Sequence, residues 1–229
     1  MAGQGGAIES SDTLLTTRIL DNAFQSSLES NKKWAEETSK RDADFFPKSA
    51  KGQAPQILWL GCSDSRIPET TILGLKPGDV FTHRNIANMI HPTDLSLLSV
   101  VEFSVRHLKV NHVVLCGHTS CGGVNAALGN SKIDVLDLWL GPMKALREQH
   151  VAELEKLEGA EKATYLSKIN VKHGVEQLRR LPPVLEAMRD RGLQVHGLIY
   201  DLATGRLEDL HCGEHESAGK KRLAVFETK

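Results

Sequence analysis

Two short segments of the sequence contain side chains that could do chemistry together. Residues 62–66 read CSDSR and residues 117–123 read GHTSCGG. Each segment comes directly after a short apolar run, ILWLG in the first case and HVVLC in the second. Such runs are typical of buried parallel strands, whose carboxyl ends meet at one edge of a sheet. We therefore expect Cys62, His118 and Cys121 to lie close together.

These three side chains form a suitable set of zinc ligands. Two thiolates and an imidazole are donors that zinc prefers, and three protein ligands leave a fourth position for water, as in catalytic sites. His118 and Cys121 are three residues apart in a loop flanked by glycines, so both side chains can point to one place. We therefore expect one catalytic Zn²⁺ ion per chain. If Cys116 or Cys212 supplied a fourth ligand, the zinc site would instead be structural.

Asp64 and Arg66 follow the first expected ligand and could serve the same site. An arginine beside a carboxylate lowers the pKa of the carboxyl group and fixes its orientation through a two-pronged contact. We expect Asp64 to accept a hydrogen bond from the reacting water while Arg66 holds the carboxylate. There are two alternatives. Asp64 binds the metal itself and closes the site, or the pair is an ordinary surface ion pair that contributes little.

The composition limits the classes of partner and the compartment. The 229 residues include 28 Lys and Arg against 29 Asp and Glu, a formal net charge of −1. This balance gives no electrostatic signature of a protein that binds nucleic acid or an anionic membrane. The apolar runs are far shorter than the roughly 20 residues of a membrane span, and the first residues lack the apolar stretch of a secretory signal. Four cysteines are too few for a disulfide scaffold, so we expect a cytoplasmic protein with reduced thiols.

The order of apolar and amphipathic runs predicts the elements that position these side chains. Short apolar strands alternate with helical patterns, which is typical of an α/β fold with a mostly parallel central sheet and flanking helices. The turn ATG between two apolar runs near the carboxyl end predicts an antiparallel edge strand there. The expected elements are strands near 56–62, 79–84, 112–116, 193–202 and 206–212, and helices near 94–108, near 122–128 and, as two longer patterns, between 135 and 191.

The amino-terminal part of the chain has a different pattern. Leu15 and Ile19 occur at helical spacing and predict an amphipathic helix from residue 11 to about residue 30. The polar segment that follows is either a plain surface segment or an arm that wraps a partner subunit. We therefore expect a helical arm over residues 1–52 and a catalytic α/β zinc domain over residues 53–229.

Taken together, the sequence is similar to the β-class carbonic anhydrases. The resemblance rests on CSDSR followed by GHTSCGG, and it continues through PGDVFTHRNIANMI, SVVEFSVRHLKV and VHGLIYDLATG. It implies reversible hydration of carbon dioxide to bicarbonate and a proton, at a zinc ion bound by Cys62, His118 and Cys121. It also implies that Asp64 and Arg66 form the orienting pair, with Asp64 as a fourth zinc ligand only in a closed state. For the whole molecule it implies an arm that embraces a second subunit, and so a homodimer or a dimer of dimers.

The resemblance extends to residues around the expected site. It places Gln53, Phe81 and Gly122 in the substrate pocket, partly across the dimer interface. Phe103 is a departure, because many members of the family have tyrosine at this position. A pocket hydroxyl is therefore missing, and we expect altered hydrogen bonding without loss of activity.

Three further residues resemble the bicarbonate-regulated subgroup of the family. In that subgroup the positions of Trp59, Arg84 and Tyr200 hold bicarbonate away from the zinc and favour the closed state. The resemblance thus implies that activity falls as pH falls and bicarbonate rises. The alternative is that Trp59 and Tyr200 are ordinary strand residues and that Arg84 pairs with a carboxylate.

Two other functions are compatible with the same residues. An enzyme on this scaffold could hydrolyse carbon disulfide or carbonyl sulfide, and only the width of the pocket would separate it from a carbonic anhydrase. A non-enzymatic protein with a structural zinc site would need a fourth protein ligand, for which Cys212 is the candidate. In each case we expect small-molecule ligands and no nucleic acid or membrane partner.

Overall fold

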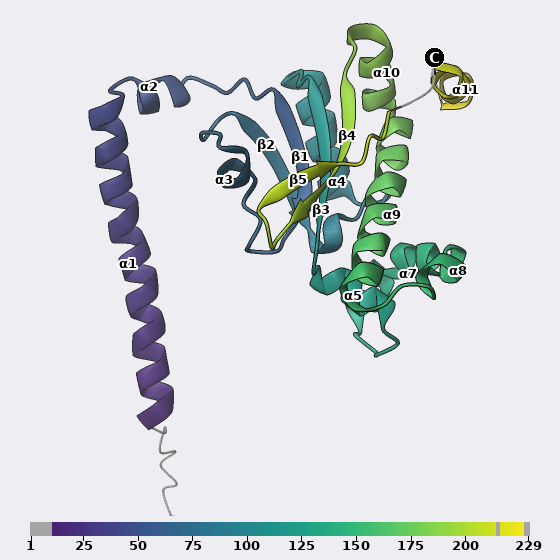
Figure 1. Ribbon diagram of the computed structural model, residues 1–229. Coiled ribbons are helices and arrows are strands. Elements are labelled where there is room, and N and C mark those ends of the chain that lie inside the picture. The colour runs from purple at the N-terminus through teal and green to yellow at the C-terminus, as the bar shows by residue number, and fades with distance from the viewer. Residues whose placement is uncertain (1–10, 214–215, 227–229) are drawn as a thin grey trace, which may run out of the picture. The chain divides into compact units, whose positions relative to one another are not determined.

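The computed structural model describes residues 11–213 and 216–226 (Figure 1). The chain divides into two compact units, Met1–Gly52 and Gln53–Lys229. The second unit contains a five-stranded, mostly parallel sheet, which confirms the predicted α/β class. None of the helices within the described residues is both long enough and apolar enough to cross a lipid bilayer.

The first unit consists of one long helix and one short helix. α1 (Ser11–Arg41) continues beyond the expected end near residue 30, and α2 (Phe45–Ser49) follows it. The added turns of α1 are rich in Lys and Glu, which have high helix propensity, so the helix persists there without an apolar stripe. The side chains of Leu15 and Ile19, the apolar positions expected on α1, lie outside the described residues.

The sheet of the second unit has the strand order β2, β1, β3, β4, β5. Its strands are β1 (Ile57–Cys62), β2 (Val80–Asn85), β3 (His112–His118), β4 (Gln194–Asp201) and β5 (Arg206–Asp209). The first four are parallel, and β5 pairs with β4 in the antiparallel direction, as expected for the closing hairpin. Because β1 and β3 are parallel neighbours, their carboxyl ends lie at the same edge of the sheet.

The helices of this unit are shorter and more numerous than expected. They are α3 (Glu69–Leu73), the 3₁₀ turn η1 (Ile86–Asn88), α4 (Leu95–Glu102), the π-helical turn η2 (Phe103–His107), α5 (Gly122–Leu128), α6 (Val135–Trp139), α7 (Gly141–Gln149), α8 (Val151–Leu154), α9 (Gly159–Arg180), α10 (Pro182–Arg191) and α11 (Glu216–Phe226). The prediction of two long helices between residues 135 and 191 was wrong, since α6 to α10 occupy this range. Gly141, Gly159 and Pro182 stand at the first positions of α7, α9 and α10, and these residue types interrupt helical patterns.

Helices contact both faces of the sheet, because successive strand residues point to opposite sides. One face packs against α4 and α9, and its buried residues include Leu58, Leu60, Val113, Leu115, Val195 and Ile199 from the strands and Val101, Val171, Val175 and Leu178 from the helices. The other face presents Trp59, Val114 and Cys116, which pack with Ile72 and Leu73 of α3. A third apolar cluster, which contains Cys62 and Cys121 together with side chains of α5, α7 and α9, lies at the carboxyl end of the strands.

Candidate metal centre

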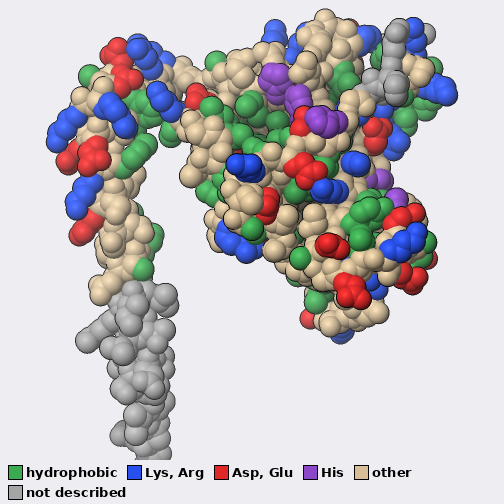
Figure 2. Space-filling model, viewed as in Figure 1, with side chains coloured by type: hydrophobic (Ala, Val, Ile, Leu, Met, Phe, Trp, Pro, Cys, Tyr) green, Lys and Arg blue, Asp and Glu red, His purple; other side chains and the backbone are tan. Residues whose placement is uncertain are grey.

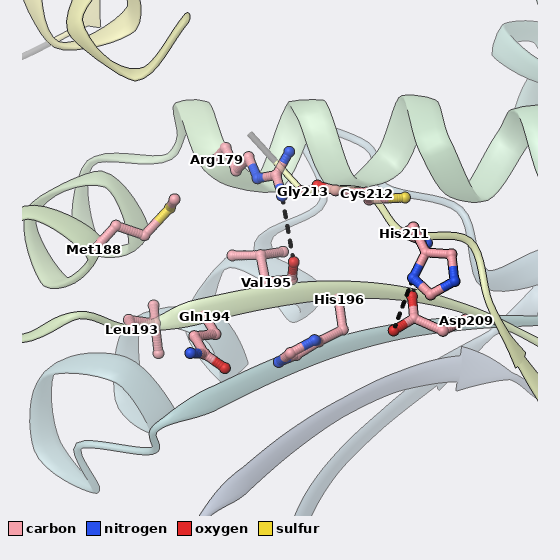
Figure 3. A pocket seen from close by; sticks show the side chains of 10 residues that line it. All are labelled: Arg179, Met188, Leu193, Gln194, Val195, His196, Asp209, His211, Cys212 and Gly213. Atoms are coloured by element: carbon pink, nitrogen blue, oxygen red, sulfur yellow. Dashed lines mark hydrogen bonds and ion pairs between the residues drawn. The ribbon is translucent and has the colours of Figure 1, made fainter. Parts of the chain in front are cut away.

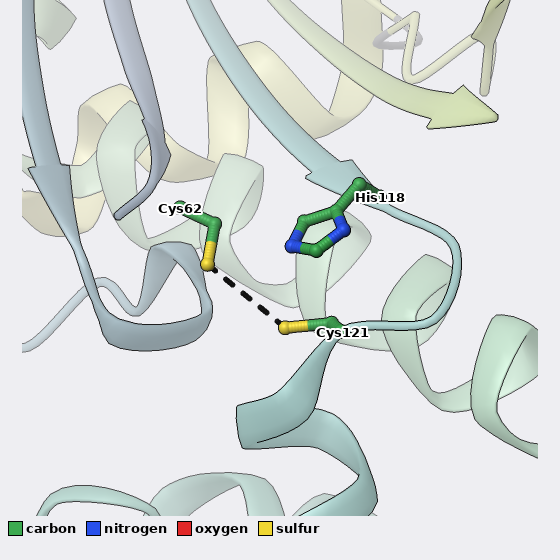
Figure 4. Close-up of side chains that lie close together, drawn as sticks. All are labelled: Cys62, His118 and Cys121. Atoms are coloured by element: carbon green, nitrogen blue, oxygen red, sulfur yellow. Dashed lines mark hydrogen bonds between the residues drawn. The ribbon is translucent and has the colours of Figure 1, made fainter. Parts of the chain in front are cut away.

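Three candidate ligands come from two neighbouring strands and the start of a helix. Cys62 is the last residue of β1, His118 is the last residue of β3, and Cys121 directly precedes α5. Figure 4 shows their side chains pointing toward one another. One ligand atom from each residue lies within 4.8 Å of the other two, and the sulfur atoms of Cys62 and Cys121 are 4.0 Å apart.

The donor atoms of this cluster fit a metal ion. All three side chains are buried, and Nδ1 of His118 is 2.9 Å from the carbonyl oxygen of Thr119, to which it donates. The proton is therefore on Nδ1, and the lone pair of Nε2 is free to bind a metal. Nε2 is buried without a hydrogen-bond partner, which is unfavourable unless a ligand satisfies it. Two thiols and this nitrogen are the donor set that zinc prefers.

The two thiols share a proton unequally in the absence of a metal. The hydrogen bond from Cys121 lowers the pKa of the Cys62 thiol to about 4, against the opposing effect of burial, and His118 and the backbone N–H groups of Asp64 and Ala87 lower it further. The same hydrogen bond, together with burial, raises the pKa of Cys121 above its usual value. One thiolate therefore forms readily, whereas the second needs a nearby cation.

The last glycine of GHTSCGG, Gly123, allows α5 to approach the loop after β2. A Cβ atom on Gly123 would lie 2.9 Å from the Cβ atom of Ala87, which is closer than packed carbon atoms allow. Gly122 differs, because no heavy atom lies within 4 Å of the place where its Cβ would be. Gly123 thus permits close packing beside the cluster, and Gly122 leaves open space in front of its backbone.

Asp64 and Arg66 form a two-pronged ion pair next to the candidate ligands. Nε of Arg66 donates to Oδ1 of Asp64 at 2.9 Å, and Nη2 donates to Oδ2 at 2.7 Å. The side-chain hydrogen bond from Arg66 holds the pKa of the Asp64 carboxyl group well below its usual range. Oδ2 of Asp64 lies 3.9 Å from Nε2 of His118, but Asp64 does not belong to the group of three gathered donors. Its carboxylate is therefore close to the cluster and oriented by the arginine.

The other two cysteines lie apart from the cluster. Cys116 is buried on the α3 face of the sheet, and burial raises the pKa of its thiol to about 12. The sulfur of Cys212 lies over Gly197 in β4, 2.8 Å from the place of an added Cβ. Neither is among the gathered donors, so the described residues offer three protein ligands at this centre and no fourth cysteine.

The expected pocket residues lie in different parts of the second unit. Gln53 is exposed at the start of the unit. Phe81 lies in β2 and packs against Phe103, with ring centroids 5.8 Å apart. Gly122 is the first residue of α5, next to the candidate ligand Cys121.

The three residues of the expected bicarbonate site lie on three parallel strands, of which β1 and β2 are neighbours and β4 is separated from β1 by β3. The indole of Trp59 lies over Gly61, since a Cβ there would be 2.5 Å from its Nε1 atom. Gly61 is in register with Arg84 of β2. Tyr200 of β4 packs in the same apolar cluster as Trp59.

Polar residues that no motif of the sequence indicates support the loop beside Cys62. Nδ2 of Asn170 in α9 donates to the carbonyl oxygen of Ala87 at 3.1 Å, and the side chain of Asn85 bonds both the N–H and the carbonyl of Met89. These bonds hold Ala87 at a φ of 59°, in the left-handed region. The sequence shows only an asparagine within a helical pattern, and its burial becomes visible in the structure.

Comparisons with known proteins agree on one family. A family model described as Carbonic anhydrase matches residues 57–207. A curated carbonic anhydrase of Emericella nidulans is 39% identical over 203 residues, which cover 88% of this chain and 89% of that protein. The carbonic anhydrase of Saccharomyces cerevisiae is also 39% identical, over 81% of this chain and 87% of its own length.

Solved structures give the same result. The crystal structure of a β-carbonic anhydrase from Aspergillus fumigatus superposes with a TM-score of 0.89 at 57% identity, over 90% of this chain and all (100%) of that one. One of two tetrameric β-carbonic anhydrases from Sordaria macrospora superposes with a TM-score of 0.83 at 49% identity, over 85% of this chain and 100% of that one.

Proposed function

Because the chain belongs to the β-class carbonic anhydrases, which hydrate carbon dioxide reversibly, we propose that it does so at one zinc ion bound by Cys62, His118 and Cys121. The observation that carries this proposal is the buried Nε2 atom of His118, which lacks a hydrogen-bond partner and lies beside two buried thiols. A bound zinc ion would lower the pKa of water and so supply a nucleophile at neutral pH, an effect for which carbonic anhydrase is itself the standard example.

The chain's own residues orient the reactants. Oδ2 of Asp64, 3.9 Å from Nε2 of His118, is near enough to the cluster to accept a hydrogen bond from the reacting water and so direct its lone pair to carbon dioxide. Arg66 keeps this carboxylate ionised and prevents it from rotating, because it bonds both oxygens. We assign to Phe81 and Gln53 the walls of the substrate pocket, and to Gly122 a backbone N–H that faces the substrate.

Substitution of Arg66 separates the orienting role from metal binding. In Arg66→Ala we expect a full zinc content and a CO₂ hydration rate about 10²-fold lower, since an unrestrained carboxylate no longer holds the position from which it orients the reacting water. In Cys62→Ser we expect zinc and turnover to be lost together. Zinc per chain is measured by elemental analysis and turnover by stopped-flow CO₂ hydration.

The control for this experiment is Arg189→Ala. Arg189 pairs with Asp190 on α10 with a similar two-pronged geometry and is distant in sequence from the motifs. It should leave zinc and turnover unchanged. Wild-type turnover in Arg66→Ala would contradict the orienting role. If the protein turned over carbonyl sulfide faster than carbon dioxide, carbonyl sulfide would be its substrate in place of carbon dioxide.

We also propose that bicarbonate regulates the enzyme by binding between Trp59, Arg84 and Tyr200. The support is the indole N–H of Trp59, which is buried without a hydrogen-bond partner. A bicarbonate oxygen would accept this hydrogen bond, and the guanidinium of Arg84 would supply the opposite charge.

For the whole molecule we propose a homodimer or a dimer of dimers in the cytoplasm, in which the first unit wraps a second copy. The tetrameric relatives from Sordaria macrospora support an oligomer, and two thiol ligands are compatible with a reducing compartment. In the first unit, Trp34 contacts Phe46 with ring centroids 5.6 Å apart, yet its side chain remains 42% exposed. Partly exposed aromatic residues of this kind are common at interfaces between subunits.

A further inference from the structure

A second group of possible metal ligands lies at the opposite end of the sheet. A cavity of about 410 Å³ is located at the amino end of β4, and its lining includes His196, Asp209 and His211 (Figure 3). His112 begins β3, whereas His118 ends it, so this group is roughly 20 Å from the candidate zinc site at about 3.3 Å per strand residue. The two groups therefore cannot share an ion.

Two histidines of neighbouring strands are already in contact here. Nδ1 of His112 lies 3.2 Å from Nε2 of His196, and the ring centroids are 5.3 Å apart. Neighbouring nitrogen ligands of a tetrahedral zinc ion, at about 2.05 Å from the metal, are about 3.3 Å apart. The two nitrogens thus have the separation that a metal requires. This contact is a hydrogen bond, so the donating nitrogen must give up its proton and both rings must rotate before the two lone pairs meet at one point.

Two more possible metal ligands, Asp209 and His211, line the same cavity. Asp209 is in register with Leu198, two residues after His196, and the N–H of Leu210 donates to the carbonyl of Gly197 at 2.9 Å. This pairing places both Asp209 and His211 beside His196. Their side chains are 48% and 88% exposed, so both have space to change rotamer, and Asp209 would then give up the hydrogen bond that its Oδ1 accepts from the N–H of His211 at 2.8 Å.

The charges around the pair are compatible with a cation. Burial and the neighbouring His112 lower the pKa of His196, so protons compete weakly for its ring at neutral pH. Asp209 supplies a negative charge. Arg179 is the opposing cation, and Glu176 offsets its charge in part through a contact of 3.0 Å, because the same carboxylate also pairs with Arg222.

We propose that His112 and His196, together with Asp209 or His211, bind a second transition-metal ion such as Zn²⁺ or Ni²⁺. Among the described residues, three donor atoms are already gathered only around Cys62. The second site has two donor atoms in place, from His112 and His196, and it gains the remaining donor atoms as the ion binds. It should therefore bind more weakly than the catalytic centre, and it should lose its ion first to a chelator.

The test is a titration of the zinc-loaded, full-length protein, purified without a polyhistidine tag, with Ni²⁺. Isothermal titration calorimetry should find one ion per chain beyond the catalytic zinc. His196→Gln and His112→Gln should each weaken this binding at least tenfold, because each leaves only one of the two contacting imidazoles. CO₂ hydration should be unchanged in both variants, which shows that they are folded.

His173→Gln is the matched control. His173 is a partly exposed histidine of α9 whose Nε2 atom contacts Gln177, and it is not part of the group. It should bind Ni²⁺ as the wild type does. If the wild type took up no further ion, or if His196→Gln and His112→Gln bound Ni²⁺ as tightly as His173→Gln, the second site would not exist.

Discussion

Arg84 connects the proposed bicarbonate site to the segment that contains Cys62 and Asp64. Its Nε atom donates to the carbonyl of Cys62 at 2.8 Å, and Nη2 donates to the carbonyl of Asp64. Nη1 lies 3.9 Å from the carboxylate of Glu69. An anion that binds this guanidinium would compete with these three contacts. Because two of them hold the backbone around Asp64, the anion would change the position of that carboxylate.

This link predicts inhibition by bicarbonate that depends on Trp59. Trp59→Phe keeps the apolar ring and removes the N–H, so we expect the inhibitory bicarbonate concentration to rise about tenfold, the effect of one hydrogen bond to a charged group. In the wild type, turnover should fall as bicarbonate is added, and more steeply at lower pH. The measurement is stopped-flow CO₂ hydration over a matrix of pH and bicarbonate.

Trp34→Phe is the control for this substitution, because Trp34 lies in the first unit and outside the proposed site. It should show the wild-type response. A wild-type rate that does not change with bicarbonate at any pH would remove the regulatory proposal and leave the catalytic one intact.

Among the elements, α9 approaches the sheet closely at several glycines, and Gly174 is the one that lies on the helix itself. A Cβ on Gly174 would lie 2.4 Å from a terminal carbon of Leu115 and 3.0 Å from Ile90. Leu115 is fully buried in β3, so it has no free space to move into. We expect Gly174→Ala to destabilise the protein by about 1–2 kcal/mol, the cost of overpacking less the gain in helix propensity.

The comparison for Gly174→Ala is Gly141→Ala at the start of α7, where no heavy atom lies within 4 Å of the added Cβ. It should be neutral or slightly stabilising. Unfolding in urea measures the free energy of unfolding of both variants. Equal stabilities of the two variants would mean that α9 can move away from β3 without loss.

The strands could be predicted from the sequence, whereas the lengths of the helices could not. Short apolar runs such as ILWLG and HVVLC are typical of buried strands and are too short for most helices. The strand ends, and with them the proximity of Cys62 and His118, therefore follow from the local pattern. Helix ends depend on tertiary contacts and on competing glycine and proline signals, which explains the misjudged carboxyl end of α1 and the five helices between residues 135 and 191.

The support of the metal centre could not be predicted for a related reason. Asn170 bonds Ala87 across 83 positions of the chain, and no local pattern reports a contact of that range. The motifs therefore identify the candidate ligands, and the structure adds the side chains that hold them in place.

At the scale of the whole molecule, large apolar side chains are exposed among the described residues of the first unit (Figure 2). Phe24 and Leu28 are 64% and 45% exposed, and they are four residues apart, so they lie on the same side of α1. Large exposed apolar side chains that share one helix face indicate a surface that binds another protein. The proposed occupant is a second copy of this chain.

The last prediction tests this assembly with the double substitution Phe24→Ser and Leu28→Ser. Burial of such side chains contributes about 1.5–3 kcal/mol each, and a symmetric dimer buries each of them twice. We therefore expect the double variant to dissociate at micromolar concentrations at which the wild type is an oligomer, as measured by size-exclusion chromatography with light scattering. CO₂ hydration should fall with it, because the proposed pocket residues Gln53 and Phe81 act partly across the interface.

The matched control for the arm is Glu29→Ser with Lys33→Ser, which changes two exposed positions of the same helix and keeps its apolar side. It should leave the molecular mass and the turnover at their wild-type values. A double variant of Phe24 and Leu28 that kept the wild-type mass down to nanomolar concentrations would show that the arm does not hold the subunits together. Unchanged mass with reduced turnover would mean instead that the arm acts on the pocket of its own chain.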